Sequence, residues 1–165
     1  MSAPWVRGVR LGIDVGSVRV GVAKCDPDGI LATPLITLAR DNSIDVAALD
    51  TAAIRSATVG VPADIAEIKH LVTEHDSVEV VVGLPVNLAG MEGPAAKKVR
   101  EYVRVLAEVI APVPIVMADE RMSTVTAARR LSDRGVKGKR QRAVVDQAAA
   151  VEILQHYLES RRRQG

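Results

Sequence analysis

The sequence predicts a mixed α/β domain in which helices flank a five-stranded sheet and the first three strands run antiparallel. Two observations carry this prediction: valine-rich runs joined by short turns fill the first forty residues, and apolar runs alternate with helical periodicity after them. The chain has 165 residues, of which 48% are hydrophobic and 25% charged, which is enough for one buried core. We expect a single domain over 1–165, with a core at about 9–160, an insertion at about 40–60 and a basic tail at 161–165.

Three strands are expected first, at Val9–Asp14, Arg19–Lys24 and Ile30–Leu38. The segment Asp26-Pro27-Asp28-Gly29 is a strong turn signal between the second and third strands. Short connections favour antiparallel neighbours. Pro34 lacks a backbone N–H, so the third strand should lie at an edge of the sheet or contain a bulge.

The second half alternates helices and strands. Between Arg40 and Gly60 the periodicity weakens, and we expect an irregular or partly helical insertion. Val78–Leu84 is apolar throughout, which is typical of a parallel strand buried on both faces. The other expected elements are a helix from Pro62 to about Glu74, a long helix after the loop Pro85–Gly93, a strand at Ile115–Ala118, a helix from Ser123 or Thr124 to about Leu131, and a last helix from about Arg142 to Ser160.

Composition excludes several classes of protein. No run of eighteen apolar residues occurs, and Met1 to Arg10 contains no apolar stretch typical of a signal peptide, so we expect a cytoplasmic protein without a membrane span. The single cysteine, Cys25, cannot form an internal disulfide. It is either a buried small hydrophobe or a thiol available for an intermolecular bridge. One cysteine and three histidines offer no zinc-type spacing.

The net charge of +2 conceals a strongly basic segment. The fourteen residues from Arg129 to Arg142 include seven basic residues and one acidic residue, Asp133, so their local charge is +6. Such a concentration predicts a polyanionic partner, with nucleic acid first, although a solvated face is the alternative. Aromatic residues make up only 2% of the chain, which favours contact with the phosphate backbone over base stacking. The candidate nucleic-acid-binding residues are Arg129, Arg130, Arg134, Lys137, Lys139, Arg140 and Arg142.

Acidic residues follow two of the expected strands. Asp14 ends the first strand, and Asp119 and Glu120 directly follow the fifth. Asp146 lies in the first turn of the expected last helix and shares an apolar stripe with Ala150 and later residues. Ligands of α/β sheets collect at strand ends, and carboxylates gathered there repel one another unless a cation neutralises them. Hard oxygen ligands favour Mg²⁺ or Mn²⁺.

Each acid also has a local interpretation. Asp14 could accept backbone N–H groups of its own turn. Glu120 could pair with Arg121, and Asp119 could cap the turn. Asp146 could be stabilised by the positive end of its helix. The residues alone leave both interpretations open.

Four segments in order closely resemble the YqgF/RuvX family: LGIDVGSVRVGVA, VVVGLPVNLAGMEGP, DERMSTVTAARRL and VVDQAAAVEIL. The resemblance extends from about Leu11 to Tyr157, and four separate motifs make it far more specific than one would. Met122 stands where leucine is common, and the 40–60 region looks longer than the family's compact form. The family's motif positions are occupied by Gly83, Leu84, Pro85, Asn87 and Gly90, and by Asp119, Glu120, Arg121, Ser123 and Thr124.

The resemblance implies a ribonuclease H-like fold and a metal-dependent endonuclease. The implied substrates are the 5′ end of pre-16S rRNA, Holliday junctions or both, and the alternative is a non-catalytic ribosome-assembly or repair factor. The family's acidic positions map onto Asp14, Glu120 and Asp146, which would be catalytic and would hold Mg²⁺ or Mn²⁺, in two-ion sites of the kind that cleave phosphodiesters. Supporting roles are expected for Asp119, Arg121, Asn87 and Ser123.

Several roles stay open at this point. Arg121 either approaches the scissile phosphate or anchors its turn, and Asn87 either donates to phosphate or holds its loop by an Asx-type bond. The loop Pro85–Gly93 either receives a phosphate at the helix terminus or simply connects strand to helix. The expected partner is pre-rRNA or branched DNA. A resolvase would also need two active sites facing opposed strands, and hence a homodimer.

Overall fold

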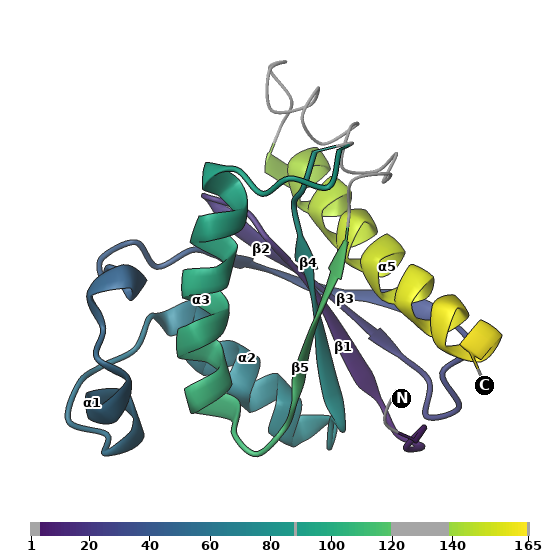
Figure 1. The fold of residues 1–165 in the computed structure, drawn as a ribbon, viewed down its shortest axis with the longest axis horizontal. Coiled ribbons are helices and arrows are strands. Elements are labelled where there is room, and N and C mark those ends of the chain that lie inside the picture. The colour runs from purple at the N-terminus through teal and green to yellow at the C-terminus, as the bar shows by residue number, and fades with distance from the viewer. Residues whose placement is uncertain (1–3, 88, 120–138, 165) are drawn as a thin grey trace.

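The computed structural model describes residues 4–87, 89–119 and 139–164, and shows one sheet with helices on both faces (Figure 1). The expected helix at 123–131 lies outside the described residues. The elements in chain order are β1 (Arg10–Val15), β2 (Arg19–Cys25), β3 (Ala32–Ala39), the 3₁₀ turn η1 (Val46–Ala48), α1 (Thr51–Arg55), α2 (Ala63–Glu74), β4 (Glu79–Leu84), α3 (Pro94–Ile110), β5 (Ile115–Asp119) and α5 (Lys139–Gln164).

The sheet has five strands in the order β3-β2-β1-β4-β5. The pairs β1–β2 and β2–β3 are antiparallel, whereas β1–β4 and β4–β5 are parallel. This confirms the expected mixed sheet with three antiparallel strands at its start. Because β1, β4 and β5 are mutually parallel, their carboxyl ends meet at one edge, and β1 places its end at the centre of the sheet.

Pro34 lies where its chemistry requires. Strand β3 is an edge strand, and its register against β2 shifts between Val22 and Ala23, directly opposite Pro34. Since proline cannot donate a ladder hydrogen bond, an edge strand with an irregularity is the place where it costs least. Both features expected from the sequence are therefore present.

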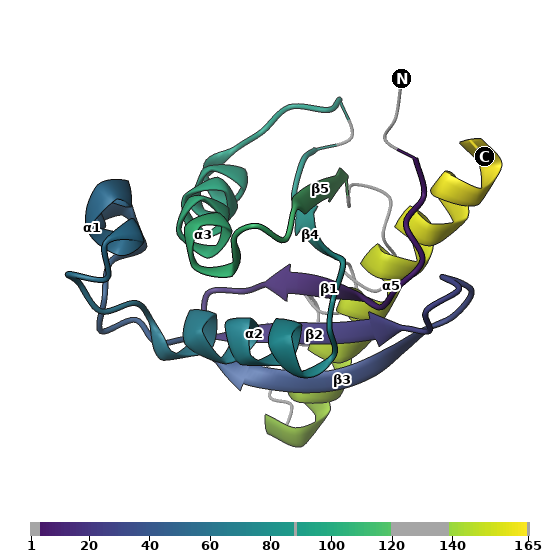
Figure 2. The same ribbon diagram turned by 90° about the horizontal axis from the view of Figure 1, so that it is seen from below.

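Alternating side chains of β1 divide the core into two layers. Leu11 and Ile13 are fully buried among residues of α2 and α3, and α5 packs against the other face of the sheet. Figure 2 shows α5 and the pair α2 and α3 separated by the strands. This second face carries glycine where the first carries large side chains, so α5 approaches the strands closely.

The closest approach is at Gly21 of β2. A Cβ placed on Gly21 would lie 2.1 Å from the backbone oxygen of Asp146, and one placed on Gly12 would lie 2.7 Å from Cβ of Leu154. Real Cβ atoms do not come this near to other heavy atoms. The two glycines therefore set the distance between the sheet and α5.

The region predicted to be an insertion, at about 40–60, contains η1 and α1, and both pack on α3. Asp45 accepts a hydrogen bond from the Ala47 N–H and caps η1, and Asp50 accepts one from the Ala53 N–H and caps α1. Arg104 of α3 then donates to Thr51 Oγ1 and to the Val46 carbonyl, at 3.0 and 2.9 Å. The partly helical interpretation of this region is thus confirmed.

Helix α5 is longer than expected. It begins at Lys139 rather than Arg142, so the prediction that Asp146 lies in the first turn is wrong. The basic residues before Arg142 are good helix formers, and they continue the helix towards Gly138. Asp146 is thus too far from the helix terminus for the dipole interpretation to hold, because the dipole acts only within the first turn. At the other end, α5 includes Arg161–Arg163, and Arg162 donates to the Gly29 carbonyl at 3.3 Å.

Within the described ranges, the helices are all too short or too polar to cross a membrane.

Gly21→Ala should destabilise the fold, because its methyl group would collide with the α5 backbone, which cannot turn aside as a flexible side chain can. We expect a loss of at least about 2 kcal/mol in the free energy of unfolding, measured by urea denaturation. Gly60→Ala is the matched control, since a Cβ there meets nothing within 4 Å. Equal stability of the two variants would contradict the close packing of α5 at Gly21.

Candidate active site

Asp14 projects from the centre of the sheet towards α5. It lies near the carboxyl end of β1 and is only 2% exposed. In the antiparallel ladder its Cα partner is Gly21, and directly opposed residues direct their side chains to the same face of a sheet. That face is the one on which α5 lies over Gly21. The Asp14 carboxylate therefore belongs to the layer between the sheet and α5.

Asp146 reaches the same place from α5. It is 3% exposed, and its backbone oxygen is the atom that a Cβ on Gly21 would strike. Farther along the helix, Ala150 and Ile153 are buried against the same sheet face, as their spacing predicts. Two acidic residues from distant parts of the chain are thus both buried on the face of the sheet that carries Gly21.

Arg19 supplies a positive charge to this pair, and sequence reasoning missed it. Its Nε lies 2.5 Å from Oδ2 of Asp146, and the Arg19 side chain is 20% exposed. A buried carboxylate needs a partner, because desolvation strongly disfavours an isolated charge. The signal was available in the sequence: Arg19 begins β2 directly after the turn that follows Asp14, so it had to emerge close to that acid.

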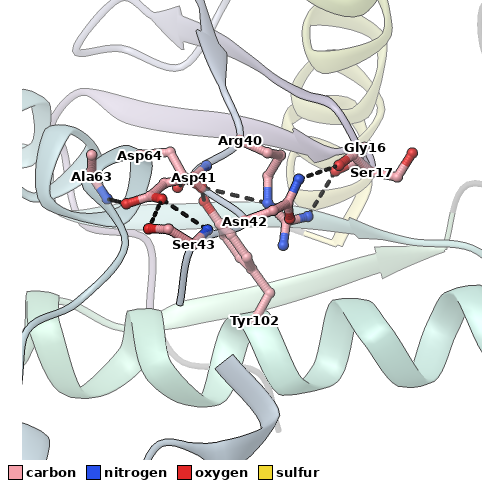
Figure 3. A network of polar contacts seen from close by, with 9 residues as sticks. All are labelled: Gly16, Ser17, Arg40, Asp41, Asn42, Ser43, Ala63, Asp64 and Tyr102. Atoms are coloured by element: carbon pink, nitrogen blue, oxygen red, sulfur yellow. Dashed lines mark hydrogen bonds and ion pairs between the residues drawn. The ribbon is translucent and has the colours of Figure 1, made fainter. Parts of the chain in front are cut away.

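The turn between β1 and β2 is held by the start of the insertion (Figure 3). The Arg40 guanidinium donates to the Gly16 carbonyl at 2.7 Å, and the Arg40 backbone N–H donates to the Val18 carbonyl at 2.8 Å. Asn42 donates to the Ser17 carbonyl at 3.2 Å. The turn itself is closed by a hydrogen bond from the Gly16 N–H to the Arg19 carbonyl. The backbone between the two charged residues Asp14 and Arg19 is therefore fixed.

A buried carboxylate holds Arg40 in turn. Asp64, at the start of α2, lies 3.7 Å from Nε of Arg40 and accepts hydrogen bonds from the Tyr102 hydroxyl at 2.6 Å and the Asp41 N–H at 3.0 Å (Figure 3). Burial and the neighbouring Asp64 carboxylate raise the pKa of Tyr102 well above its ordinary value, so its hydroxyl stays a donor. Asp41 accepts from the Ala63 N–H at 2.9 Å. The network connects α2 and α3 to the turn beside Asp14.

Asp119 does not share the layer of the other two acids. It is exposed at the end of β5, and its register partner is Leu84, which packs in the core on the α2 and α3 side. Residues in register on adjacent strands direct their side chains to the same face, so Asp119 faces α3 rather than α5. The structure gives no account of Glu120, Arg121 and Ser123, which lie outside the described residues.

The basic segment is largely outside the described residues as well. Of its members, Lys139, Arg140 and Arg142 lie in α5, without described side chains, and Arg129, Arg130, Arg134 and Lys137 precede the helix. Its role as a nucleic-acid surface remains a prediction. Its placement directly before the part of α5 that carries Asp146 follows from the chain itself.

Asn87 holds its own loop. Its Oδ1 accepts hydrogen bonds from the N–H groups of Ala89 and Met91, at 3.0 and 2.9 Å, and its own N–H donates to the Met91 carbonyl. This is the Asx-type arrangement that the sequence left as one of two alternatives. At the end of the loop, Gly93 precedes α3 without a side-chain cap, and Glu92 pairs with Arg100 at 2.6 and 2.7 Å.

The described acids fit part of a cation site. Asp14 and Asp146 are hard oxygen donors, buried on one face of the sheet, and this donor type suits Mg²⁺ or Mn²⁺. Among the described residues no group of three or more Asp, Glu, His or Cys side chains could hold a metal ion. A further protein ligand for an ion at Asp14 and Asp146 would have to come from beyond the described part, where Glu120 directly follows β5 in the chain.

Comparison with known families decides the class of protein. The model of the family described as "RuvX: Holliday junction resolvase" matches residues 8–62 and 46–160. The chain belongs to the RuvX family. It is 52% identical to a Streptomyces avermitilis protein over 160 residues, covering 96% of this chain and 90% of the relative, and 52% identical to a Frankia casuarinae protein over 154 residues, covering 93% and 68%. Both relatives carry the name "Putative pre-16S rRNA nuclease". The sequence-based identification of the family is confirmed. Both relatives are named as nucleases, the class of enzyme that the sequence predicts.

Solved structures confirm the fold. Thermus thermophilus RuvC in complex with a Holliday junction substrate superimposes with a TM-score of 0.50 at 18% identity, covering 94% of this chain and 96% of that one. A second RuvC structure from the same organism gives a TM-score of 0.50 at 16% identity. At this identity the likeness concerns the fold, and it supports the ribonuclease H-like arrangement expected for a RuvX protein.

Tyr102→Phe should destabilise the protein by about 1–3 kcal/mol, because it removes a hydrogen bond from the buried Asp64 carboxylate. Thermal and urea unfolding would measure the loss. Tyr157→Phe makes the same chemical change at the amino ends of β1 and β4, where Tyr157 donates to Glu79 at 2.8 Å and Glu79 keeps its ion pair with Arg10. We expect the smaller loss there, and the reverse order would contradict the importance of the Asp64 network.

Proposed function

We propose that this RuvX protein is a metal-dependent endonuclease for structured nucleic acid, with Asp14, Glu120 and Asp146 as its catalytic acids. The observation that carries the proposal is the placement of Asp14 and Asp146, which two distant segments bury on one face of the sheet beside Gly21. Structural stability alone gives no reason to bury two acids there, since burying charge is costly. Charge stabilisation of a reacting phosphodiester does give a reason.

The carboxylates would act as ligands, and the fold orients them. Asp14 is fixed by β1 at the sheet centre, and Asp146 is fixed by the contact of α5 with Gly21, so neither acid depends on a loop for its position. When bound, Mg²⁺ or Mn²⁺ ions, two of them in sites of this kind, would supply charge to activate a water and stabilise the leaving 3′ oxygen, giving a 5′-phosphate product. Glu120, the residue after β5, would complete the ligand set, with Asp119, Arg121, Asn87 and Ser123 in support.

For the substrate, we propose the 5′ end of pre-16S rRNA, Holliday junctions or both, in the cytoplasm. The names of the relatives support the first, and the family description supports the second. A junction presents two opposed strands, so its resolution would require a homodimer with two sites. Both substrates are polyanions, which the basic segment between Arg129 and Arg142 would bind by their phosphates.

A non-catalytic assembly or repair factor is the second candidate. One observation favours it: Arg19 already neutralises Asp146, which is what a carboxylate without a metal needs. A binding protein of this kind would retain its affinity for nucleic acid and cleave none. Activity measurements on acid-to-amide variants separate the two candidates.

Asp14→Asn and Asp146→Asn should each reduce Mn²⁺-dependent cleavage of a pre-16S rRNA fragment or a four-way junction by about 100-fold or more, because each removes charge from the ligand set. Gel assays with both substrates, using the same preparation, would measure the rates. Asp28→Asn is the control, since Asp28 is exposed in the turn between β2 and β3 and pairs with Arg7. Cleavage by either variant within a few-fold of the parent would refute the assignment of that acid.

Replacing Lys137, Lys139 and Arg140 with alanine should weaken binding to all duplex sequences alike. Each lost phosphate contact should reduce the magnitude of the salt slope by about 0.9. Folding should be little affected if these three side chains face solvent, because exposed charges contribute little to stability. Titration of a labelled duplex at several salt concentrations would measure both effects.

The control for this experiment is Lys69→Ala, which removes an exposed cation from α2 on the other face of the sheet. It should leave the slope unchanged. Equal slopes and affinities for the parent and the triple variant would exclude the segment as a binding surface, leaving Arg161–Arg163 as the next candidate.

A further inference from the structure

Arg19 has a fixed backbone and a partly exposed side chain. Its carbonyl accepts the Gly16 N–H, and the turn before it is held by Arg40 through the Gly16 and Val18 carbonyls. The side chain, in contrast, is 20% exposed, whereas the Asp146 side chain that it contacts is 5% exposed. The guanidinium therefore lies between the buried acid and the solvent. The backbone from which the side chain extends is held by hydrogen bonds.

The Asp146 carboxylate is already paired with one cation. Its Oδ2 is 2.5 Å from Nε of Arg19. A divalent ion on the same carboxylate would be repelled by the guanidinium, because two positive charges a few ångströms apart repel each other more strongly in a partly buried site than in water. Arg19 and a divalent cation are thus competitors for Asp146.

A guanidinium that leaves a carboxylate has an obvious second partner in a nuclease. Its planar fork of N–H donors matches the oxygens of a phosphate as well as those of a carboxylate. The nucleic acid must bring a phosphodiester to the acids that cleave it, and Arg19 is at that point the nearest described cation to Asp146. An exchange between the two anions would leave neither Asp146 nor the guanidinium unpaired.

We propose that Arg19 is an exchangeable counter-ion, which binds Asp146 in the free protein and moves to a phosphodiester oxygen of the nucleic acid when Asp146 takes up its divalent cation. The proposal rests on the proposed function, since it requires Asp146 to be a metal ligand. It goes beyond that function by making metal and nucleic acid bind cooperatively through one side chain. By thermodynamic linkage, each ligand must then strengthen the other by the same factor.

A permanent structural ion pair predicts the opposite behaviour. If Arg19 only oriented Asp146, its removal would misplace the carboxylate and weaken metal binding. If Arg19 competes with the metal, its removal strengthens metal binding. The sign of the change therefore separates the two roles without any measurement of cleavage.

The first measurement is Mn²⁺ binding to the full chain without nucleic acid, by calorimetric titration. Arg19→Gln removes the charge and should bind Mn²⁺ about five-fold more tightly or better, in the range of ordinary coupling between sites. Arg19→Lys keeps the charge and should stay within about two-fold of the parent. Asp146→Asn should lose the site.

The second measurement is binding of a phosphorothioate four-way DNA junction with and without Mg²⁺, which prefers oxygen ligands and therefore leaves the sulfur-substituted junction uncleaved. The parent should gain affinity when Mg²⁺ is added. Arg19→Gln should show a gain smaller by the same factor by which its Mn²⁺ affinity rose. Arg19→Lys, which lacks the fork, should also show a reduced gain, so the proposal stays testable if Arg19→Gln does not fold.

Unchanged or weaker Mn²⁺ binding by Arg19→Gln would overturn the exchange and leave the metal site intact. A full Mg²⁺-dependent gain in Arg19→Lys would overturn it as well. If the parent itself shows no Mn²⁺ binding that depends on Asp146, the proposed function fails, and the exchange fails with it.

Discussion

The contact between the backbone of α5 and Gly21 of β2 is the constraint on which the candidate site depends. Any side chain at Gly21 would occupy the space of the Asp146 carbonyl, so glycine there allows the helix to lie directly on the sheet. Since Gly21 is the ladder partner of Asp14, the same contact that seats the helix also brings Asp146 to the strand that carries Asp14. The packing of α5 and the placement of both acids therefore depend on one position.

Two buried carboxylates in that layer require positive charge nearby, because desolvation disfavours an isolated charge. Arg19 meets part of it through Asp146, and its own position depends on a turn held by Arg40. Arg40 depends in turn on Asp64, which Tyr102 and the Asp41 N–H keep hydrogen-bonded in the core. These contacts give the region at about 40–60 a structural role. Arg40 and Asn42 at its start hold the β1–β2 turn, and η1 and α1 pack on α3, which carries Tyr102.

The sheet could be predicted because its signals are local. Alternating valines, the turn at Asp26–Gly29 and the anomaly of Pro34 each specify a strand or its place, and the structure has all of them. The start of α5 could not, because the basic residues before Arg142 suit a helix and a solvated loop equally well. Arg19 was missed for a different reason. Its position after the turn places it near Asp14, but its ion-pair partner Asp146 lies 127 positions away, and strand periodicity carries no information about that partner.

The positions of the acids, too, could be predicted only in part. Asp146 was expected on the inward face from its stripe with Ala150 and Ile153, and this is confirmed by its burial. The separation of Asp119 from the other two acids is a matter of strand register, which sets the face on which a side chain emerges and which a one-residue shift would reverse. Both residues lie near the end of a strand, so the sequence alone did not show that Asp14 and Asp119 are directed to different faces of the sheet.

The most direct test of the central claim is a crystal structure of the protein grown with Mn²⁺, with the ion located by its anomalous scattering. The account predicts Mn²⁺ bound between the sheet and α5, with oxygens of both Asp14 and Asp146 as direct ligands. Mn²⁺ located elsewhere, with Asp146 still paired to Arg19 at saturating metal, would contradict it.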